Sequence, residues 1–314
     1  MKTSLVTGAS GFIGSNLCRE LLVRGQKVIG IDNYSTSDGS NLLELQKNQN
    51  FNFIRGSVLE PEFFPNSEQV DFVFHLASPA SPQHYLALGL ETLKANTQGT
   101  ENLIQFALDH NSTFLFASTS EIYGDPQVTP QVESYWGNVN PIGPRSVYDE
   151  SKRLGETLVS HFNRHKGLRG KIVRIFNTYG PGMDPFDGRV VSSFIRQAIL
   201  GEPFSVFGDG TQTRSFCYID DLVLGLIAMS ESEESGPINL GNPLEMDLLT
   251  LGELIAQFVG VEAKFSFTEL PEDDPKQRRP DISLAKSKLS WEPLIDLETG
   301  IEKTAQWIRG SLES

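Results

Sequence analysis

Cysteine is scarce in this sequence of 314 residues, which contains only Cys18 and Cys217. Two cysteines cannot form a disulfide framework, and by themselves they cannot supply the four ligands of a structural zinc site. The first residues also lack a basic segment followed by an apolar stretch of signal-peptide length. We therefore expect a reducing compartment, and the sequence predicts a cytoplasmic protein without a metal site.

Basic residues and long apolar runs are scarce as well. Lys and Arg total 26 against 40 Asp and Glu, so the formal net charge is −14. Such a charge repels polyanions, and a small anionic substrate would need a local cluster of basic residues. No run reaches the roughly 18 apolar residues of a membrane-spanning helix. We expect neither a nucleic-acid nor a membrane partner.

The pattern of the first 177 residues predicts an α/β fold. Short β-branched or aromatic runs alternate with longer segments of helical periodicity. Strands are expected at residues 4–7, 27–31, 51–54, 71–74, 113–117 and 171–176, and helices at residues 12–24, 81–108 and 147–165. Because strands that alternate with helices form a parallel sheet covered on both faces, we predict a Rossmann-type doubly wound sheet.

The remainder of the chain has a different pattern. After Asn177, Gly- and Pro-rich connections separate short periodic segments. This change predicts a smaller C-terminal α+β substrate domain over residues 178–314, beside a first domain over residues 1–177. Whether segments around residues 212–242 return to the first domain is left open. The acidic run Glu272-Asp273-Asp274 is expected to be a solvated loop.

Three glycines, Gly8, Gly11 and Gly14, follow the first expected strand and open the first expected helix. Glycines in this position let the backbone approach a pyrophosphate at the N-terminus of the helix. Asp32 ends the second expected strand, where a carboxylate accepts hydrogen bonds from a ribose 2′-hydroxyl and repels a 2′-phosphate. The pattern predicts NAD rather than NADP. The alternatives are a tight turn without a ligand and an ordinary turn that starts at Asp32-Asn33.

Tyr148 and Lys152 stand four residues apart on an expected helix and therefore share a face. A nearby ammonium group favours the phenolate, so we expect Lys152 to lower the pKa of Tyr148 and make it a base. The run Ser118-Thr119-Ser120-Glu121 ends the fifth expected strand, at the edge where open α/β sheets bind ligands. Each of Thr119 and Ser120 taken alone could instead cap a helix or a turn.

Taken together, these motifs resemble the extended short-chain dehydrogenase/reductase family of nucleotide-sugar enzymes. Longer strings are similar to those of the UDP-glucuronate decarboxylase (UDP-xylose synthase) family, and the resemblance covers nearly the whole chain. The strings run over residues 75–82, 135–145, 174–178, 187–191, 239–243 and 271–275.

The resemblance implies tightly held NAD, a UDP-glucuronate or UDP-xylose ligand, and roles for individual residues. It implies Tyr148 as base, Lys152 as its activator and a ribose contact, Thr119, Ser120 and Glu121 around the sugar, and Arg278 beside the carboxylate. Substrate contacts are expected from Lys94, Asn177, Arg214 and Arg278. Cofactor contacts are expected from Gly8, Gly11, Phe12, Ile13, Gly14, Asp32, Asn33, Ser57, Val58, Leu76, Ala77, Ser78, Tyr148, Lys152, Thr178 and Arg189.

The family resemblance also implies a homodimer. Helices over residues 81–108 and 147–165 would pack against their symmetry mates, and Leu86, Leu90, Leu93 and Thr97 recur at helical spacing as an apolar seam would. The alternative is that this face packs inside the monomer.

Three positions depart from the family pattern: Ser57 replaces an Asp that reaches the adenine, Ala95 replaces a common Thr near the cofactor, and Gly182 replaces an Arg. None of them removes a residue assigned to chemistry.

Several functions share oxidation of the sugar C4 hydroxyl as a first step. A 4,6-dehydratase needs an acid that Ser120 does not supply, and related 4-epimerases generally lack an acid at the position of Glu121. Decarboxylation of UDP-glucuronate uses both Ser120 and Glu121, so it is the function that the resemblance favours. A non-enzymatic NAD-binding scaffold on the same fold is the remaining alternative.

Overall fold

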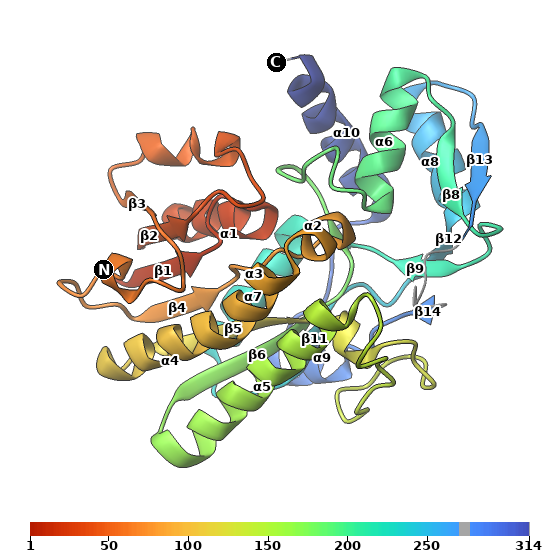
Figure 1. The fold of residues 1–314 in the computed structure, drawn as a ribbon. Helices are drawn as coiled ribbons and strands as arrows, with labels where there is room; N and C mark the ends of the chain where they lie inside the picture. Colours follow the sequence, from red (N-terminus) through yellow and green to blue (C-terminus); the bar gives the residue numbers. More distant parts are fainter. Residues whose placement is uncertain (270–276, 314) are drawn as a thin grey trace.

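A seven-stranded sheet, parallel throughout, forms the centre of the molecule (Figure 1). The computed structural model describes residues 1–269 and 277–313. The strand order is β11-β6-β5-β4-β1-β2-β3. In chain order the strands are β1 (Thr3–Thr7), β2 (Lys27–Asp32), β3 (Phe51–Arg55), β4 (Phe72–His75), β5 (Thr113–Thr119), β6 (Arg169–Ile175) and β11 (Ile238–Leu240).

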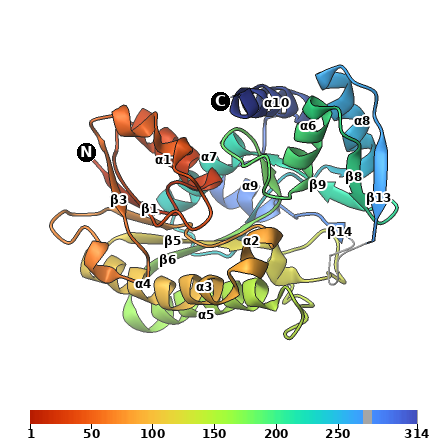
Figure 2. The same ribbon diagram turned by 45° about the horizontal axis from the view of Figure 1, so that its top comes forward.

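Helices cover both faces of this sheet, as Figure 2 shows. On one face lie α1 (Phe12–Val23) and α7 (Ile219–Glu231), which contact each other. On the other face lie α3 (Gly89–Lys94), α4 (Thr100–Asp109) and α5 (Ser146–Lys166). The predicted Rossmann-type doubly wound sheet is confirmed.

Alternation of apolar side chains along the strands explains the two layers. Val6 and Val28 pack into a core shared with α1 and α7, whereas their neighbours Leu5 and Ile29 pack into the core under α4 and α5. All four are fully buried. Because both faces are covered, the strands consist of nearly continuous apolar residues, and such runs can be predicted from the sequence.

The segment expected to form one helix over residues 81–108 is interrupted. It contains α2 (Pro82–Ala87), α3, the π-helical turn η4 (Ala95–Gly99) and α4. Leu88 leaves the helical conformation with φ −117° and ψ 46°. The apolar spacing continues across these breaks, so periodicity alone did not reveal them.

The C-terminal part combines short strands with helices. Its strands pair as β7 with β10, as β12-β9-β14 and as β8 with β13. Their bounds are β7 (Thr178–Tyr179), β8 (Phe204–Phe207), β9 (Thr213–Ser215), β10 (Cys217–Tyr218), β12 (Glu245–Asp247), β13 (Phe265–Thr268) and β14 (Gln277–Arg278). The helices are α6 (Val190–Leu200), α8 (Leu248–Val259), α9 (Ser283–Leu289) and α10 (Leu297–Glu313). Four 3-10 turns complete the described elements: η1 (Ser40–Leu42), η2 (Leu45–Lys47), η3 (Pro61–Phe63) and η5 (Ser120–Tyr123).

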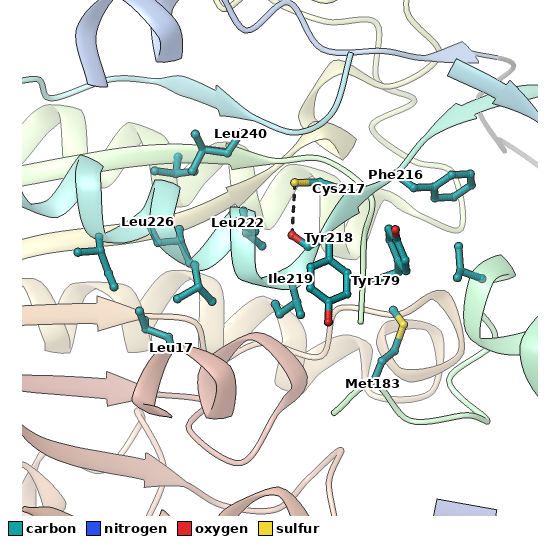
Figure 3. Packing of buried hydrophobic residues seen from close by; sticks show 14 of the residues in the cluster. Leu17, Tyr179, Met183, Phe216, Cys217, Tyr218, Ile219, Leu222, Leu226 and Leu240 are labelled. Carbon is teal, nitrogen blue, oxygen red and sulfur yellow. Dashed lines mark hydrogen bonds between the residues drawn. The ribbon is translucent and has the colours of Figure 1, made fainter. Parts of the chain in front are cut away.

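One hydrophobic core joins the two parts of the chain. Leu222 and Leu226 of α7 pack in the same cluster as Leu17 of α1 and Met183 of the C-terminal part (Figure 3). Residues 217–240 include α7 and β11. Helix α7 packs on α1, β5 and β6, and β11 extends the central sheet beside β6. This segment therefore lies against the sheet even though it follows residue 177 in the sequence.

Both cysteines are free and buried, and burial raises the pKa of each thiol. None of the helices described here has the length and apolar character needed to cross a membrane. The acidic run Glu272–Asp274, expected to be a solvated loop, lies outside the described residues.

Candidate active site

A cavity of about 1180 Å³ opens where the carboxyl ends of the sheet strands face the C-terminal part of the chain. Its wall includes the glycine turn after β1, the Thr119–Glu121 segment after β5 and residues that follow β6. Ligand pockets for one small molecule usually measure about 300–1,000 Å³. The cavity therefore has room for a dinucleotide together with a second ligand.

The glycine turn forms a backbone cradle at the N-terminus of α1. Gly8 has φ +73°, a conformation that favours glycine. A Cβ atom on Gly14 would lie 2.0 Å from the carbonyl oxygen of Gly8, so a larger residue cannot fit there. This close packing leaves the first backbone N–H groups of α1 open toward the cavity, as pyrophosphate binding requires. The turn fits the predicted dinucleotide.

Asp32 holds this cradle in place. Its carboxylate accepts hydrogen bonds from the backbone N–H groups of Ser10 at 3.0 Å and Tyr34 at 2.8 Å. Burial raises the pKa of Asp32, and the hydrogen bonds from Tyr34 and Ser10 oppose that rise. Ser10 and Tyr34 both line the cavity, so the carboxylate lies directly behind its wall.

Tyr148 lies on the cavity wall with only 6% of its surface exposed. Its ring stacks on the ring of Tyr85 from α2, with centroids 5.0 Å apart and an interplanar angle of 9°. Burial and the negative charge of Glu121 raise the pKa of Tyr148 to about 12, and a side-chain hydrogen bond with Thr119 lowers it in part. Thr119 is thereby placed beside the phenol hydroxyl.

Lys152 does not act on the phenol as expected. Its Nζ donates a hydrogen bond of 2.8 Å to the carbonyl of Ala117 and lies 5.8 Å from the centroid of the Tyr148 ring. Burial lowers the pKa of Lys152 to about 7, so the group is only partly charged at neutral pH. The expected lowering of the Tyr148 pKa is wrong for the polypeptide by itself, because burial and the negative charge of Glu121 raise that pKa.

Glu121 is clamped by two arginines. Arg145 Nη2 donates to Glu121 Oε2 at 2.7 Å, and Arg278 bonds both carboxylate oxygens through Nη1 and Nη2. Burial raises the pKa of Glu121, but the charges and hydrogen bonds of Arg278 and Arg145 lower it by a larger amount. The resulting pKa is about 2. Glu121 is therefore ionised at neutral pH, and it cannot itself supply a proton to a substrate there.

The structure brings most of the predicted site residues to the cavity. Those that line it are Gly8, Gly11, Phe12, Ile13, Gly14, Leu76, Ser78, Thr119, Ser120, Glu121, Tyr148, Lys152, Asn177, Thr178, Arg189, Arg214 and Arg278. Six cationic side chains line it among the described residues: Arg145, Lys152, Arg189, Arg196, Arg214 and Arg278. These cations meet the requirement for local positive charge in a chain of net charge −14.

Six predicted residues do not line the cavity. Asp32, Asn33 and Ala77 lie close behind it: Asp32 bonds Ser10, and the backbone N–H of Ala77 donates to Thr7 Oγ1 at 3.4 Å. Val58 packs over Gly99, and its neighbour Ser57 does not reach the cavity either. Lys94 is exposed on α3, and the structure does not bring it to the substrate cavity of its own chain.

Among the wall residues that sequence reasoning missed are Arg145 and Tyr85. Arg145 ends the decarboxylase-like string over residues 135–145 and stands three residues before Tyr148, and that spacing was the available signal. The ring of Tyr85 lies against both Tyr148 and the guanidinium of Arg145, whose Cζ is 6.0 Å from its centroid. No local motif marks Tyr85, because the stack depends on how α2 packs on α5.

Comparison with known proteins agrees with this geometry. Residues 4–241 match the model of the NAD dependent epimerase/dehydratase family. The chain is 46% identical to UDP-glucuronic acid decarboxylase 1 of Xenopus tropicalis, over 99% of this chain and 73% of the relative. It is 48% identical to UDP-glucuronic acid decarboxylase 1 of Arabidopsis thaliana, over 98% of this chain and 70% of the relative.

A solved structure shows the same fold with ligands. The UDP-glucuronic acid 4-epimerase of Bacillus cereus, in complex with UDP-glucuronic acid and NAD, superposes with a TM-score of 0.87 at 30% identity, over 98% of this chain and 99% of that one. The chain therefore belongs to the NAD dependent epimerase/dehydratase family, and within it to the UDP-glucuronic acid decarboxylases.

Proposed function

We propose that this chain uses bound NAD to decarboxylate UDP-glucuronate to UDP-xylose through a 4-keto sugar. The observation that carries the proposal is the cluster of Arg145, Glu121 and Arg278 beside Tyr148, because it supplies two buried guanidinium groups for a sugar carboxylate next to a phenol base. The decarboxylases of Xenopus tropicalis and Arabidopsis thaliana support this substrate.

Each residue at the cavity has its own role in this reaction. Tyr148 takes the proton of the C4 hydroxyl, and Thr119 holds the C4 oxygen through its hydroxyl. Arg145 and Arg278 orient the C5 carboxylate, while Glu121 and Ser120 complete that wall. The glycine turn at Gly8, Gly11 and Gly14, supported from behind by Asp32, would hold NAD, which would supply a hydride acceptor and donor for C4 and a positive charge that favours the phenolate of Tyr148.

Loss of carbon dioxide follows from the C4 ketone. The bond between C5 and the carboxyl carbon breaks, and its electron pair passes to the ketone as an enolate. C5 then takes a proton from solvent, since Glu121 is ionised, and return to C4 of the hydride that NAD would hold reduces the ketone and gives the xylose sugar. The chain must therefore hold the carboxylate in a fixed orientation, and Arg145 and Arg278 lie on the cavity wall where they can do so.

A 4-epimerase is the second candidate, because the solved epimerase shares the fold and takes UDP-glucuronic acid. The two functions are separated by incubating the purified protein with UDP-glucuronate and NAD and measuring the mass of the product and its configuration at C4. We expect loss of carbon dioxide, and UDP-glucose serves as the control sugar without a carboxylate. A product that keeps its carboxylate and is inverted at C4 would establish the epimerase instead.

Asp32 is expected to select NAD. Replacing it with Ala removes an ionised acceptor for the ribose and loosens the turn that Ser10 and Tyr34 support. Because hydrogen bonds to a charged group contribute about 1.5–3 kcal/mol, Asp32→Ala should weaken NAD binding by about 10- to 100-fold and reduce the discrimination against NADP. Titration with both nucleotides checks this, and equal affinity of the unchanged protein for NAD and NADP contradicts it.

We also propose a cytoplasmic homodimer whose interface includes α3 and α5. Leu86 and Leu90 are 55% and 69% exposed, and Leu154 of α5 is 47% exposed, so this apolar face is not covered within the monomer. Lys94 lies one helical turn from Leu90, on the same surface.

Charge on this face is expected to separate the two copies. Leu90→Glu should shift the protein from dimer to monomer at micromolar concentration, because it buries an unpaired carboxylate at the interface. Leu294→Glu, on a side chain that is 78% exposed elsewhere, is the matched control and should leave the assembly unchanged. Sedimentation gives the result, and an unchanged protein that sediments as a monomer rules the dimer out.

A further inference from the structure

A buried carboxyl group beside the cavity has no role in the mechanism above. Asp149 directly follows Tyr148 on α5 and is 6% exposed. Its Oδ1 has no hydrogen-bond partner among the described residues, and it forms no ion pair with them. Asp149 does not line the cavity, so any effect on a ligand must pass through its neighbours.

Those neighbours are the charged groups that surround the substrate wall. Arg145 stands four residues earlier, immediately before the first residue of α5, and its carbonyl accepts a hydrogen bond of 3.2 Å from the backbone N–H of Asp149. Glu150 is next in the chain. The charges of Glu121 on η5 and of Arg278 on β14 act on Asp149, and the phenols of Tyr148 and of Tyr85 from α2 interact with the same charged groups. Burial raises the pKa of Asp149 to about 7, Glu121 and Glu150 raise it, and Arg145 and Arg278 lower it.

The charges of this cluster depend on what occupies the cavity. Among these groups, Arg145 and Arg278 carry positive charges, and Glu121 and an ionised Asp149 carry negative ones. A carboxylate that binds the same two arginines adds a negative charge that water does not screen. An unbalanced buried charge is costly, and a group whose pKa lies near the working pH relieves it by taking a proton.

We propose that Asp149 takes up a proton when the carboxylate of the sugar nucleotide binds beside Arg145 and Arg278, and so offsets the negative charge that the ligand adds to this cluster. This inference rests on the proposed function, since it requires the C5 carboxylate of UDP-glucuronate at these arginines. Asp149 is a positioning residue that acts through the arginines, not one that touches the substrate.

The proton taken up matches the stoichiometry of the reaction. Decarboxylation turns one carboxylate and one proton into neutral carbon dioxide and a C5–H bond. The added negative charge therefore disappears in the same cycle that consumes the proton, and Asp149 returns to its ionised form. The product has no carboxylate, so its binding should not protonate Asp149.

Binding-linked proton uptake tests the proposal directly. UDP-glucuronate is titrated at pH 7.5 into NAD-loaded Tyr148→Phe protein, whose turnover is expected to be at least about 100-fold slower, in two buffers of different ionisation enthalpy. We expect uptake of about half to three-quarters of a proton per site, the amount at pH 7.5 for a carboxyl group whose pKa rises from about 7 by one or more units. UDP-xylose should give no uptake. Adding Asp149→Asn should abolish the uptake, and Glu150→Gln, the matched control one residue away, should retain it.

The pH dependence of the unchanged enzyme gives a second measurement that does not depend on a variant folding. The folded-state pKa of Asp149 rises on binding, so affinity is greatest below pH 7 and falls as pH rises through the pKa of the free site. KM for UDP-glucuronate should increase above pH 7, up to about tenfold for each unit by which binding raises the pKa, while the inhibition constant of UDP-xylose stays level. In Asp149→Asn, KM should not change over this range.

Two results overturn the inference. Uptake that persists in Asp149→Asn, or equal uptake with UDP-xylose, removes Asp149 from the linkage. UDP-glucuronate that binds and is decarboxylated without proton uptake also overturns it but leaves the proposed function standing, whereas failure of UDP-glucuronate to bind overturns both.

Discussion

Replacement of Tyr148 by Phe is expected to lower the turnover of UDP-glucuronate by at least about 100-fold, and by up to about 10,000-fold, the range that general acid–base groups contribute. Tyr148 is only 6% exposed. The substitution removes its hydroxyl and leaves the ring stacked on Tyr85. The arginines that hold the carboxylate do not depend on that hydroxyl. Binding of UDP-glucuronate should therefore remain largely intact.

The test compares kcat with the dissociation constant of UDP-glucuronate for the same protein. Tyr135→Phe is the matched control, because Tyr135 is a half-buried tyrosine outside the cavity whose hydroxyl accepts a hydrogen bond from the backbone of Gln127. It should keep nearly full turnover. Turnover at the level of the unchanged protein in Tyr148→Phe would refute the proposed chemistry altogether.

Most of the sheet could be predicted from the sequence because its strands are buried on both faces. The expected strand over residues 27–31 corresponds to β2, Lys27–Asp32, and the glycine turn lies where the strand-turn-helix pattern placed it. In both cases a local pattern determines the structure: continuous apolar runs for the strands, and glycines that a close backbone approach requires for the turn.

The electrostatic part of the site could not be predicted in the same way. Glu121 and Arg278 are 157 residues apart in sequence and meet only because β14 pairs with β9 beside the end of β5. A pKa depends on burial in three dimensions. The spacing of Tyr148 and Lys152 therefore predicted the correct helix face but the wrong direction for the pKa shift of Tyr148. Lys94 illustrates a further limit, because a motif match does not say whether a side chain faces the cavity of its own chain.

Glu121→Gln is expected to separate oxidation of the sugar from the steps that follow it. Tyr148, Lys152 and Thr119 remain, so the C4 ketone should still form. The amide lacks the negative charge that fixes Arg145 and Arg278, and these guanidinium groups lose the partner that orients them toward the carboxylate. Loss of one preorganised electrostatic contact typically costs about 100- to 1,000-fold in rate. Decarboxylation and protonation at C5 should slow by that factor, while oxidation at C4 slows much less.

The keto sugar provides the measurement. Single-turnover samples of Glu121→Gln, analysed by mass, should contain a 4-keto sugar nucleotide that the unchanged enzyme does not release, and UDP-xylose should form slowly. The matched control is Glu156→Gln, which removes the charge of a similarly buried glutamate that pairs with Arg174 at 2.8 Å but does not line the cavity. Both substitutions disrupt a buried ion pair and should lower stability, yet only Glu121→Gln should accumulate the keto sugar, since only its arginines face the substrate. If both variants slow every step equally and release no keto sugar, Glu121 serves the fold and not the positioning of the carboxylate.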